Sequence, residues 1–172
     1  HMKRVHLVMQ GKGGVGKSFV ASIIAQHLGS QGKEVVCVDT DPINRTLSGY
    51  GALNAIPLEI MENDEILPRS FDSLIDIIIE APGHTVVDCG ASSFLPLAHY
   101  LITNEVVSFL AEQDIEIVVH TVITGGQALL DTLSGFTQLA SQFPSPSLLC
   151  VWLNPFWGKV ESSGKGFEDT KA

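Results

Sequence analysis

Residues 11–18 read Gly-Lys-Gly-Gly-Val-Gly-Lys-Ser, directly after an apolar run at residues 5–9 and directly before a pattern with helical spacing. The stretch satisfies the pattern Gly-x-x-x-x-Gly-Lys-Ser, for which only about 0.006 chance matches are expected in a chain of this length. Between a strand and a helix, such glycines let backbone N–H groups converge on phosphate oxygens, and the helix N-terminus adds partial positive charge. The stretch therefore predicts a phosphate-binding loop, and a plain glycine-rich turn is the weaker alternative.

This loop supplies candidate ligands for a nucleotide and for a magnesium ion. The side chain of Lys17 can reach the β- and γ-phosphates, and the hydroxyl of Ser18 can bind Mg²⁺. The residues expected to contact the nucleotide are Gly11, Gly13, Gly14, Val15, Gly16, Lys17, Ser18 and Phe19.

Short apolar runs alternate with helical patterns along the rest of the chain. Runs rich in Val and Ile, most of them without strict alternation, predict buried parallel strands at residues 5–9, 35–38, 85–87, 115–123 and 148–153. Helical spacing of apolar residues appears at residues 20–28, 71–79 and 129–136. This order predicts an α/β fold with an open, mainly parallel, doubly wound sheet and helices on both faces. Ligands of such sheets bind at the carboxyl ends of the strands.

Composition limits the class of protein further. With 172 residues, 45% of them hydrophobic, residues 1–172 are expected to form a single domain. The formal net charge of -9 disfavours nucleic acid, and no run of eighteen apolar residues is present. The sequence supports neither DNA nor membrane association, and we expect a soluble cytoplasmic protein. The three cysteines form no Cys-x-x-Cys pair, so the sequence gives no support for zinc or iron–sulfur ligation within the chain.

Two stretches lack a regular apolar period. Residues 41–65 are rich in Gly, Pro and Asn and are expected to be a loop with at most one short helix. Residues 155–172 are expected to be a loop that leads to further C-terminal elements of a longer protein.

The first lysine of the loop, Lys12, is not required by the general pattern. The stretch Lys-Gly-Gly-Val-Gly-Lys-Ser at residues 12–18 resembles the deviant Walker A motif of the ParA/MinD ATPases. The resemblance implies ATP and ADP as ligands. It also implies that Lys12 contacts phosphate across an ATP-sandwiched homodimer, where a cation from the partner stabilises charge on the transferring phosphoryl group, as an arginine finger does. A solvated loop lysine is the alternative.

A second segment resembles a motif of the same family. The sequence Asp39-Thr40-Asp41-Pro42 is similar to the switch I motif, in which Asp41 would orient or deprotonate the attacking water and Asp39 would support the magnesium shell. Pro42 keeps Asp41 out of the helical conformation. A simple turn-capping role explains either aspartate alone.

A third segment follows the apolar run at residues 85–87. Asp88-Cys89-Gly90 resembles the Walker B and switch II motif, which implies that Asp88 holds Mg²⁺, usually through water; a helix cap is the alternative. The family more often shows a Pro or Gly pair after the Asp-Cys, so the segment Gly90-Ala91-Ser92-Ser93 is a departure from its pattern. At the end of the last strand, Asn154-Pro155 matches the place where the family reads the adenine edge, and an Asn-Pro turn is the alternative.

Residues 151–158, together with Ser18-Phe19 where the family usually has Thr-Thr, resemble the conjugal-transfer TraL and plasmid-stability StbB group. This resemblance implies a magnesium-dependent switch that binds and hydrolyses ATP, dimerises with ATP, and acts with a plasmid-transfer or partition protein. One alternative is a nucleotide-gated interaction module with little turnover. A weaker one is a kinase for a small metabolite.

Overall fold

The computed structural model describes residues 2–41 and 43–170, which contain a six-stranded parallel sheet in the order β3-β2-β6-β1-β7-β8. The strands of this sheet are β1 (Lys3–Val8), β2 (Val35–Asp39), β3 (Ile56–Pro57), β6 (His84–Asp88), β7 (Ile115–Thr124) and β8 (Leu148–Asn154). Two small antiparallel hairpins lie outside it and are formed by β4 (Met61–Glu62) with β5 (Glu65–Ile66) and by β9 (Glu161–Ser162) with β10 (Lys165–Gly166).

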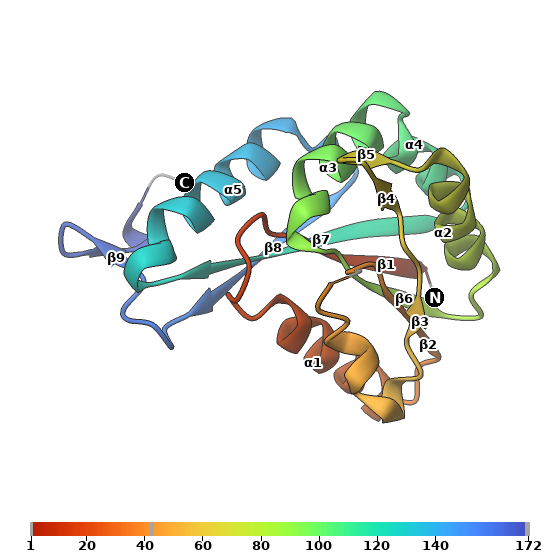
Figure 1. Ribbon diagram of the computed structural model, residues 1–172, viewed down its shortest axis with the longest axis horizontal. Coiled ribbons are helices and arrows are strands. Elements are labelled where there is room, and N and C mark those ends of the chain that lie inside the picture. Colours follow the sequence, from red (N-terminus) through yellow and green to blue (C-terminus); the bar gives the residue numbers. More distant parts are fainter. Residues whose placement is uncertain (1, 42, 171–172) are drawn as a thin grey trace.

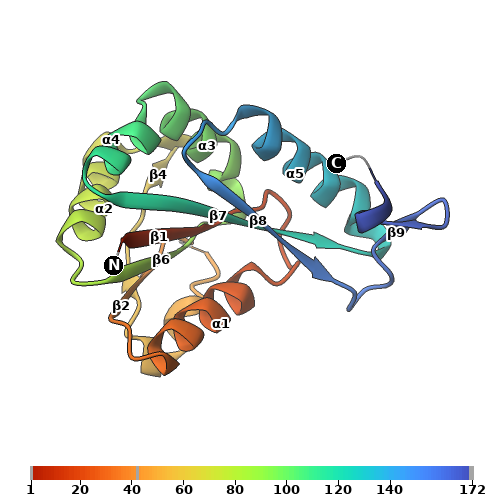
Figure 2. The ribbon, with the colours of Figure 1, turned by 180° about the vertical axis from the view of Figure 1, so that it is seen from behind.

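Helices cover both faces of the sheet, as Figure 1 and the reverse view in Figure 2 show. Their bounds are α1 (Lys17–Ser30), α2 (Pro68–Glu80), α3 (Phe94–Thr103), α4 (Val106–Glu112) and α5 (Leu129–Gln142). Helix α1 packs on one face, over a cluster that includes Val8, Cys37 and Val86. The other helices pack on the opposite face, where apolar residues of all four join one larger cluster. The predicted doubly wound α/β sheet is confirmed.

All five predicted strands and all three predicted helices are present, with ends that differ by a few residues. Helices α3 and α4 were not predicted. Phe94, Leu97, Ala98 and Leu101 do have helical spacing and are buried. The break at Asn104 and Glu105, where Glu105 has a φ of 52°, divides this pattern into two short pieces. Within the described residues no single helix is long and apolar enough to cross a membrane, although Ala91–Thr103 and Val106–Glu112, bent by 60°, pass that test as a pair.

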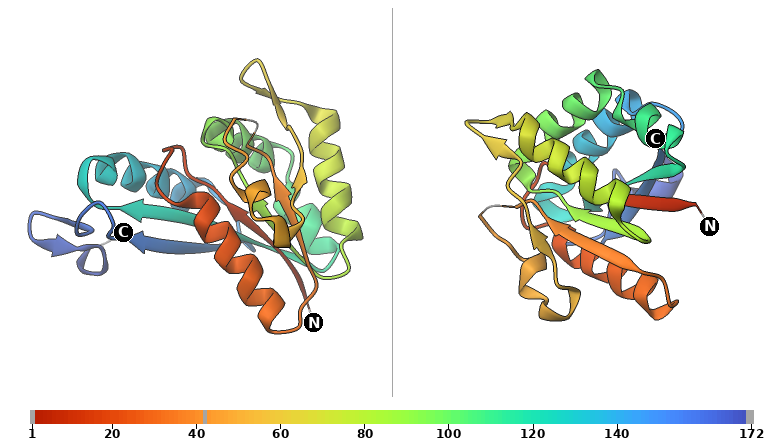
Figure 3. Two further views of the ribbon diagram at one scale, coloured as in Figure 1. Left: turned by 60° about the horizontal axis from the view of Figure 1, so that its bottom comes forward. Right: turned by 90° about the vertical axis from the view of Figure 1, so that its right-hand side faces the viewer.

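The two stretches predicted to be loops contain short elements. Residues 47–53 form two turns of 3-10 helix, and β3 adds a short edge strand beside β2. Leu47 is fully buried against the α1 side of the sheet, so this loop has an apolar anchor. The hairpin β9–β10 projects beyond the carboxyl ends of β7 and β8 (Figure 3).

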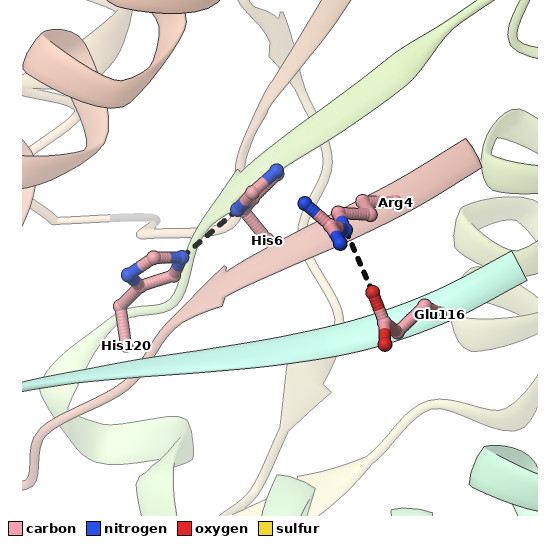
Figure 4. Close-up of polar contacts among 4 residues, drawn as sticks. All are labelled: Arg4, His6, Glu116 and His120. Carbon is pink, nitrogen blue, oxygen red and sulfur yellow. Dashed lines mark hydrogen bonds and ion pairs between the residues drawn. The ribbon is translucent and has the colours of Figure 1, made fainter. Parts of the chain in front are cut away.

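A row of polar rings crosses the sheet on the α1 side. Trp152, which is half-buried and packs against the apolar cluster beneath α1, donates its indole N–H to His120 Nδ1 at 3.0 Å. His120 Nε2 lies 2.9 Å from His6 Nδ1 (Figure 4). Since His120 Nδ1 accepts, its Nε2 carries the hydrogen and donates to His6. His6 Nε2 is buried and has no hydrogen-bond partner among residues 2–41 and 43–170. Burial, with help from neighbouring cations and rings, lowers the pKa of His6 to about 3, and burial lowers that of His120 to about 4.

Acidification should therefore destabilise the fold. The unfolded chain binds a proton at each histidine below about pH 6.5, whereas folded His6 stays neutral. The variant His6→Gln is the comparison, because its amide does not titrate but can still accept from His120. When the pH falls from about 7.5 to about 5.5, we expect the free energy of unfolding of the wild type to fall by about 1.4 kcal/mol more than that of His6→Gln. Urea unfolding at the two pH values measures this difference, and equal losses would contradict it.

Candidate nucleotide-binding site

The predicted site residues from four separate segments meet at the carboxyl end of the sheet. The register pairs Val8 of β1 with Asp88 of β6, and Asp88 with Asp39 of β2. Asn154 ends β8, which lies two strands from β1 in the sheet, and its side chain contacts the loop after β1. The structure thus brings together residues that lie up to 139 positions apart.

The loop after β1 has the backbone conformation that its glycines permit. Gly14 and Gly16 have φ values of 72° and 103°, which are strained for residues with a Cβ. Val15 between them is buried and anchors the loop. Helix α1 begins at Lys17, so the loop ends at a helix N-terminus as expected, while the side chain of Phe19 points to solvent with 61% of its surface exposed.

Ser18 and Asp88 form the best candidate magnesium site. Ser18 Oγ donates to Asp88 Oδ2 at 2.5 Å, and Asp88 is 1% exposed. Burial raises the pKa of Asp88 to about 6, against the opposing effects of the Ser18 hydrogen bond and the Lys17 charge. A hydroxyl and a carboxylate are the hard oxygen donors that Mg²⁺ prefers, and buried Lys17 lies beside them, so these residues fit the ion.

Asp39 lies beside this pair and is also buried, but both of its carboxylate oxygens are already used. Oδ1 accepts from the backbone N–H of Asp41 at 3.1 Å. Oδ2 accepts from the N–H and the hydroxyl of Ser48, at 3.0 and 2.9 Å. The structure therefore ties Asp39 to its own loop.

Asp41 lies at the rim of the site and is half-buried. Its Oδ1 accepts from the N–H groups of Ile43 and Asn44, both at 3.0 Å, which is a turn-capping arrangement. Its Cα lies 3.3 Å from where a Cβ on Gly90 would stand, so the segment after β2 packs directly on the segment after β6. Pro42, which was predicted to shape this turn, lies outside the described residues.

The side chain of Lys12 extends from the phosphate-binding loop toward Asp131 of α5. Its Nζ lies 3.3 Å from Asp131 Oδ2, and both side chains are about half exposed. Gln10, which is 1% exposed, connects the start of the loop to β7 and α5. Its amide donates to the carbonyl of Val122 in β7 at 3.0 Å and to that of Thr132 in α5 at 3.3 Å. Lys12 is thus paired within its own chain while still accessible to solvent.

Asn154 contacts the phosphate-binding loop itself. Its Nδ2 donates to the carbonyl of Val15 at 3.0 Å, and its Oδ1 accepts from the N–H of Phe156 at 3.1 Å. The same Nδ2 stands 3.3 Å from where a Cβ on Gly16 would lie. Recognition of adenine by Asn154 and Pro155 remains a prediction.

Sequence reasoning missed four residues that connect these segments. Thr40 lies within the predicted switch I motif, but no role was predicted for it. Its N–H and its hydroxyl both donate to the carbonyl of Asp88, at 3.0 and 2.8 Å. Ser48, Asp131 and Gln10 were not predicted to take part either. Their partners lie nine or more positions away in the chain, so local spacing contains no sign of them.

Fold and loop together define a P-loop nucleotide-binding protein. A family profile described as "ParA: NUBPL iron-transfer P-loop NTPase" matches residues 1–78. Two Escherichia coli proteins named Protein TraL are 56% and 57% identical over 171 residues, which cover 99% of this chain and 71% of each relative. The chain therefore belongs to the TraL proteins of the ParA/MinD family of P-loop NTPases.

Solved structures agree on the fold. The MinC:MinD cell division complex of Aquifex aeolicus matches with a TM-score of 0.56 at 16% identity, over 88% of this chain and 68% of that chain. A plasmid partition protein of Borrelia burgdorferi matches with a TM-score of 0.54 at 16% identity, over 96% of this chain and 82% of that one.

The contacts of Asn154 lead to a test of its role. If Asn154 acts by holding the loop, Asn154→Ala should weaken binding of ATP and GTP by about the same factor, on the order of tenfold for a lost buried hydrogen bond. Fluorescence titration with labelled ATP and GTP measures both affinities. A loss confined to ATP would show instead that Asn154 reads the adenine edge.

Proposed function

We propose that this protein is a magnesium-dependent, ATP-binding and ATP-hydrolysing switch that acts in plasmid conjugal transfer. The observation that carries the proposal is the bonded pair of Ser18 and Asp88 beside buried Lys17, at the end of an intact glycine-rich loop. The part in conjugal transfer rests on the extent of the similarity to TraL, which covers 99% of the chain.

Different groups of the chain bind different parts of the triphosphate. Backbone N–H groups of residues 13–18 and the N-terminus of α1 bind the phosphate oxygens, and Lys17 neutralises the β- and γ-phosphates. Ser18 and Asp88 would hold the magnesium ion, which would supply positive charge where negative charge develops. Asp41 orients the attacking water once its carboxylate exchanges the N–H groups of Ile43 and Asn44 for that water.

ATP-driven dimerisation is the second part of the proposal. Lys12 can reach the nucleotide of a partner subunit only after its ion pair with Asp131 breaks. Because both side chains are about half exposed, breaking this ion pair costs little free energy. A lysine delivered across the interface would then favour hydrolysis through its charge. A conjugal-transfer protein that binds only one nucleotide state would be the downstream partner.

The three charged residues have separable expected effects. Lys17→Ala should abolish nucleotide binding, Asp41→Ala should keep ATP binding but stop hydrolysis, and Lys12→Ala should bind ATP as a monomer. Fluorescence titration with labelled ATP measures binding, light scattering with Mg²⁺ and ADP, then with ATP, measures the oligomeric state, and phosphate release measures hydrolysis.

The decisive comparison is wild type against Asp41→Ala. An ATP-specific dimer that Asp41→Ala traps and Lys12→Ala loses would support the switch. Equal turnover in wild type and Asp41→Ala would refute the role of Asp41, and ATP binding without any phosphate release would favour an interaction module instead.

A further inference from the structure

The carboxylate of Asp39 holds both ends of the loop that follows β2. At the near end it accepts from the N–H of Asp41, and at the far end it accepts both polar hydrogens of Ser48. Asp39 is 2% exposed, so these charge-assisted hydrogen bonds are shielded from water. Three donors on two oxygens satisfy a buried charge that would otherwise be costly.

The far end of the loop is fixed independently of Asp39. Leu47, next to Ser48, is fully buried in the cluster beneath α1. At the near end, Thr40 is held by its two hydrogen bonds to the carbonyl of Asp88. Asp39 therefore links two anchored points, and the segment from Asp41 to Ser48 becomes a closed loop whose ends cannot separate while these bonds last.

We propose that Asp39 is a positioning residue that closes this loop through Ser48, in place of the magnesium role that the resemblance implies. The proposal rests on the proposed function, because the group that the loop positions is the carboxylate of Asp41. The Asp39–Ser48 contact holds the backbone of Asp41 against Gly90, beside the Ser18–Asp88 pair. Ser48 is thereby a positioning residue for hydrolysis as well, because it acts through Asp39 and Asp41.

Limited proteolysis tests the closed loop without any nucleotide. Arg45 is exposed within the loop and is a trypsin site. Ser48→Ala removes one of the three bonds to Asp39, so cleavage after Arg45, followed as fragment 1–45 by mass spectrometry, should accelerate about tenfold. Ser48→Thr keeps the hydroxyl and should restore the wild-type rate. Ser73→Ala is the matched control, because the Ser73 hydroxyl donates to the Arg69 carbonyl on the exposed side of α2, away from the loop. A wild-type cleavage rate in Ser48→Ala would overturn the proposal.

Magnesium titration separates positioning from metal binding. Asp39→Asn presents an amide N–H group to donors and should open the loop to trypsin as Ser48→Ala does. It should leave the Mg²⁺ concentration for half-maximal binding of labelled ATP within about twofold of wild type, whereas loss of a metal ligand raises it about tenfold or more. The larger rise would overturn the proposal.

Single-turnover hydrolysis supplies the last measurement. In Ser48→Ala the rate of phosphate release should fall severalfold at saturating ATP while the affinity for ATP stays unchanged, since only the placement of Asp41 is disturbed. If no variant and not even the wild type binds nucleotide, the proposed function fails, and the trypsin comparison still decides whether Asp39 closes the loop.

Discussion

Asp88 is the residue at which three segments of the chain meet, and the geometry of the site depends on its contacts. Its buried carboxylate accepts from Ser18 at the start of α1, and its carbonyl accepts two hydrogen bonds from Thr40 after β2. A carboxylate that is 1% exposed at the end of a strand is removed from bulk water and needs donors within the fold. The donor to the carboxylate is Ser18 at the end of the phosphate-binding loop, and the donors to the carbonyl belong to Thr40 after β2, so the polar groups of one residue hold both segments together.

The parallel sheet makes this arrangement feasible. Strand β6 lies between β1 and β2, so the loops after β1 and β2 open beside Asp88 at the same end of the sheet. Helix α1 closes one face below these loops and the other four helices close the opposite face. With apolar packing provided on both faces, the polar residues at the carboxyl ends of the strands are free to bond one another across segments.

Buried polar contacts also extend away from the nucleotide site. Gln10 ties the beginning of the phosphate-binding loop to β7 and α5, and its amide oxygen lies 2.6 Å from where a Cβ on Gly135 would stand. Asn154 ties the same loop to the end of β8. The phosphate-binding loop is therefore joined by hydrogen bonds to α5 and to the turn that carries exposed Phe156 and Trp157.

The amino-acid sequence by itself determined the glycine-rich loop, the order of strands and helices, and the acidic residues at the strand ends, because each depends on spacing over a few neighbouring residues. It also predicted Lys17, Ser18 and Asp88 as neighbours, since strands of a parallel sheet end at the same edge. Only the tertiary structure decided the partners of the buried polar groups. Asp39 bonds Ser48, Lys12 pairs with Asp131, and His6 pairs with His120, because each group bonds whatever donor or acceptor the packing of distant segments places within about 3 Å of it.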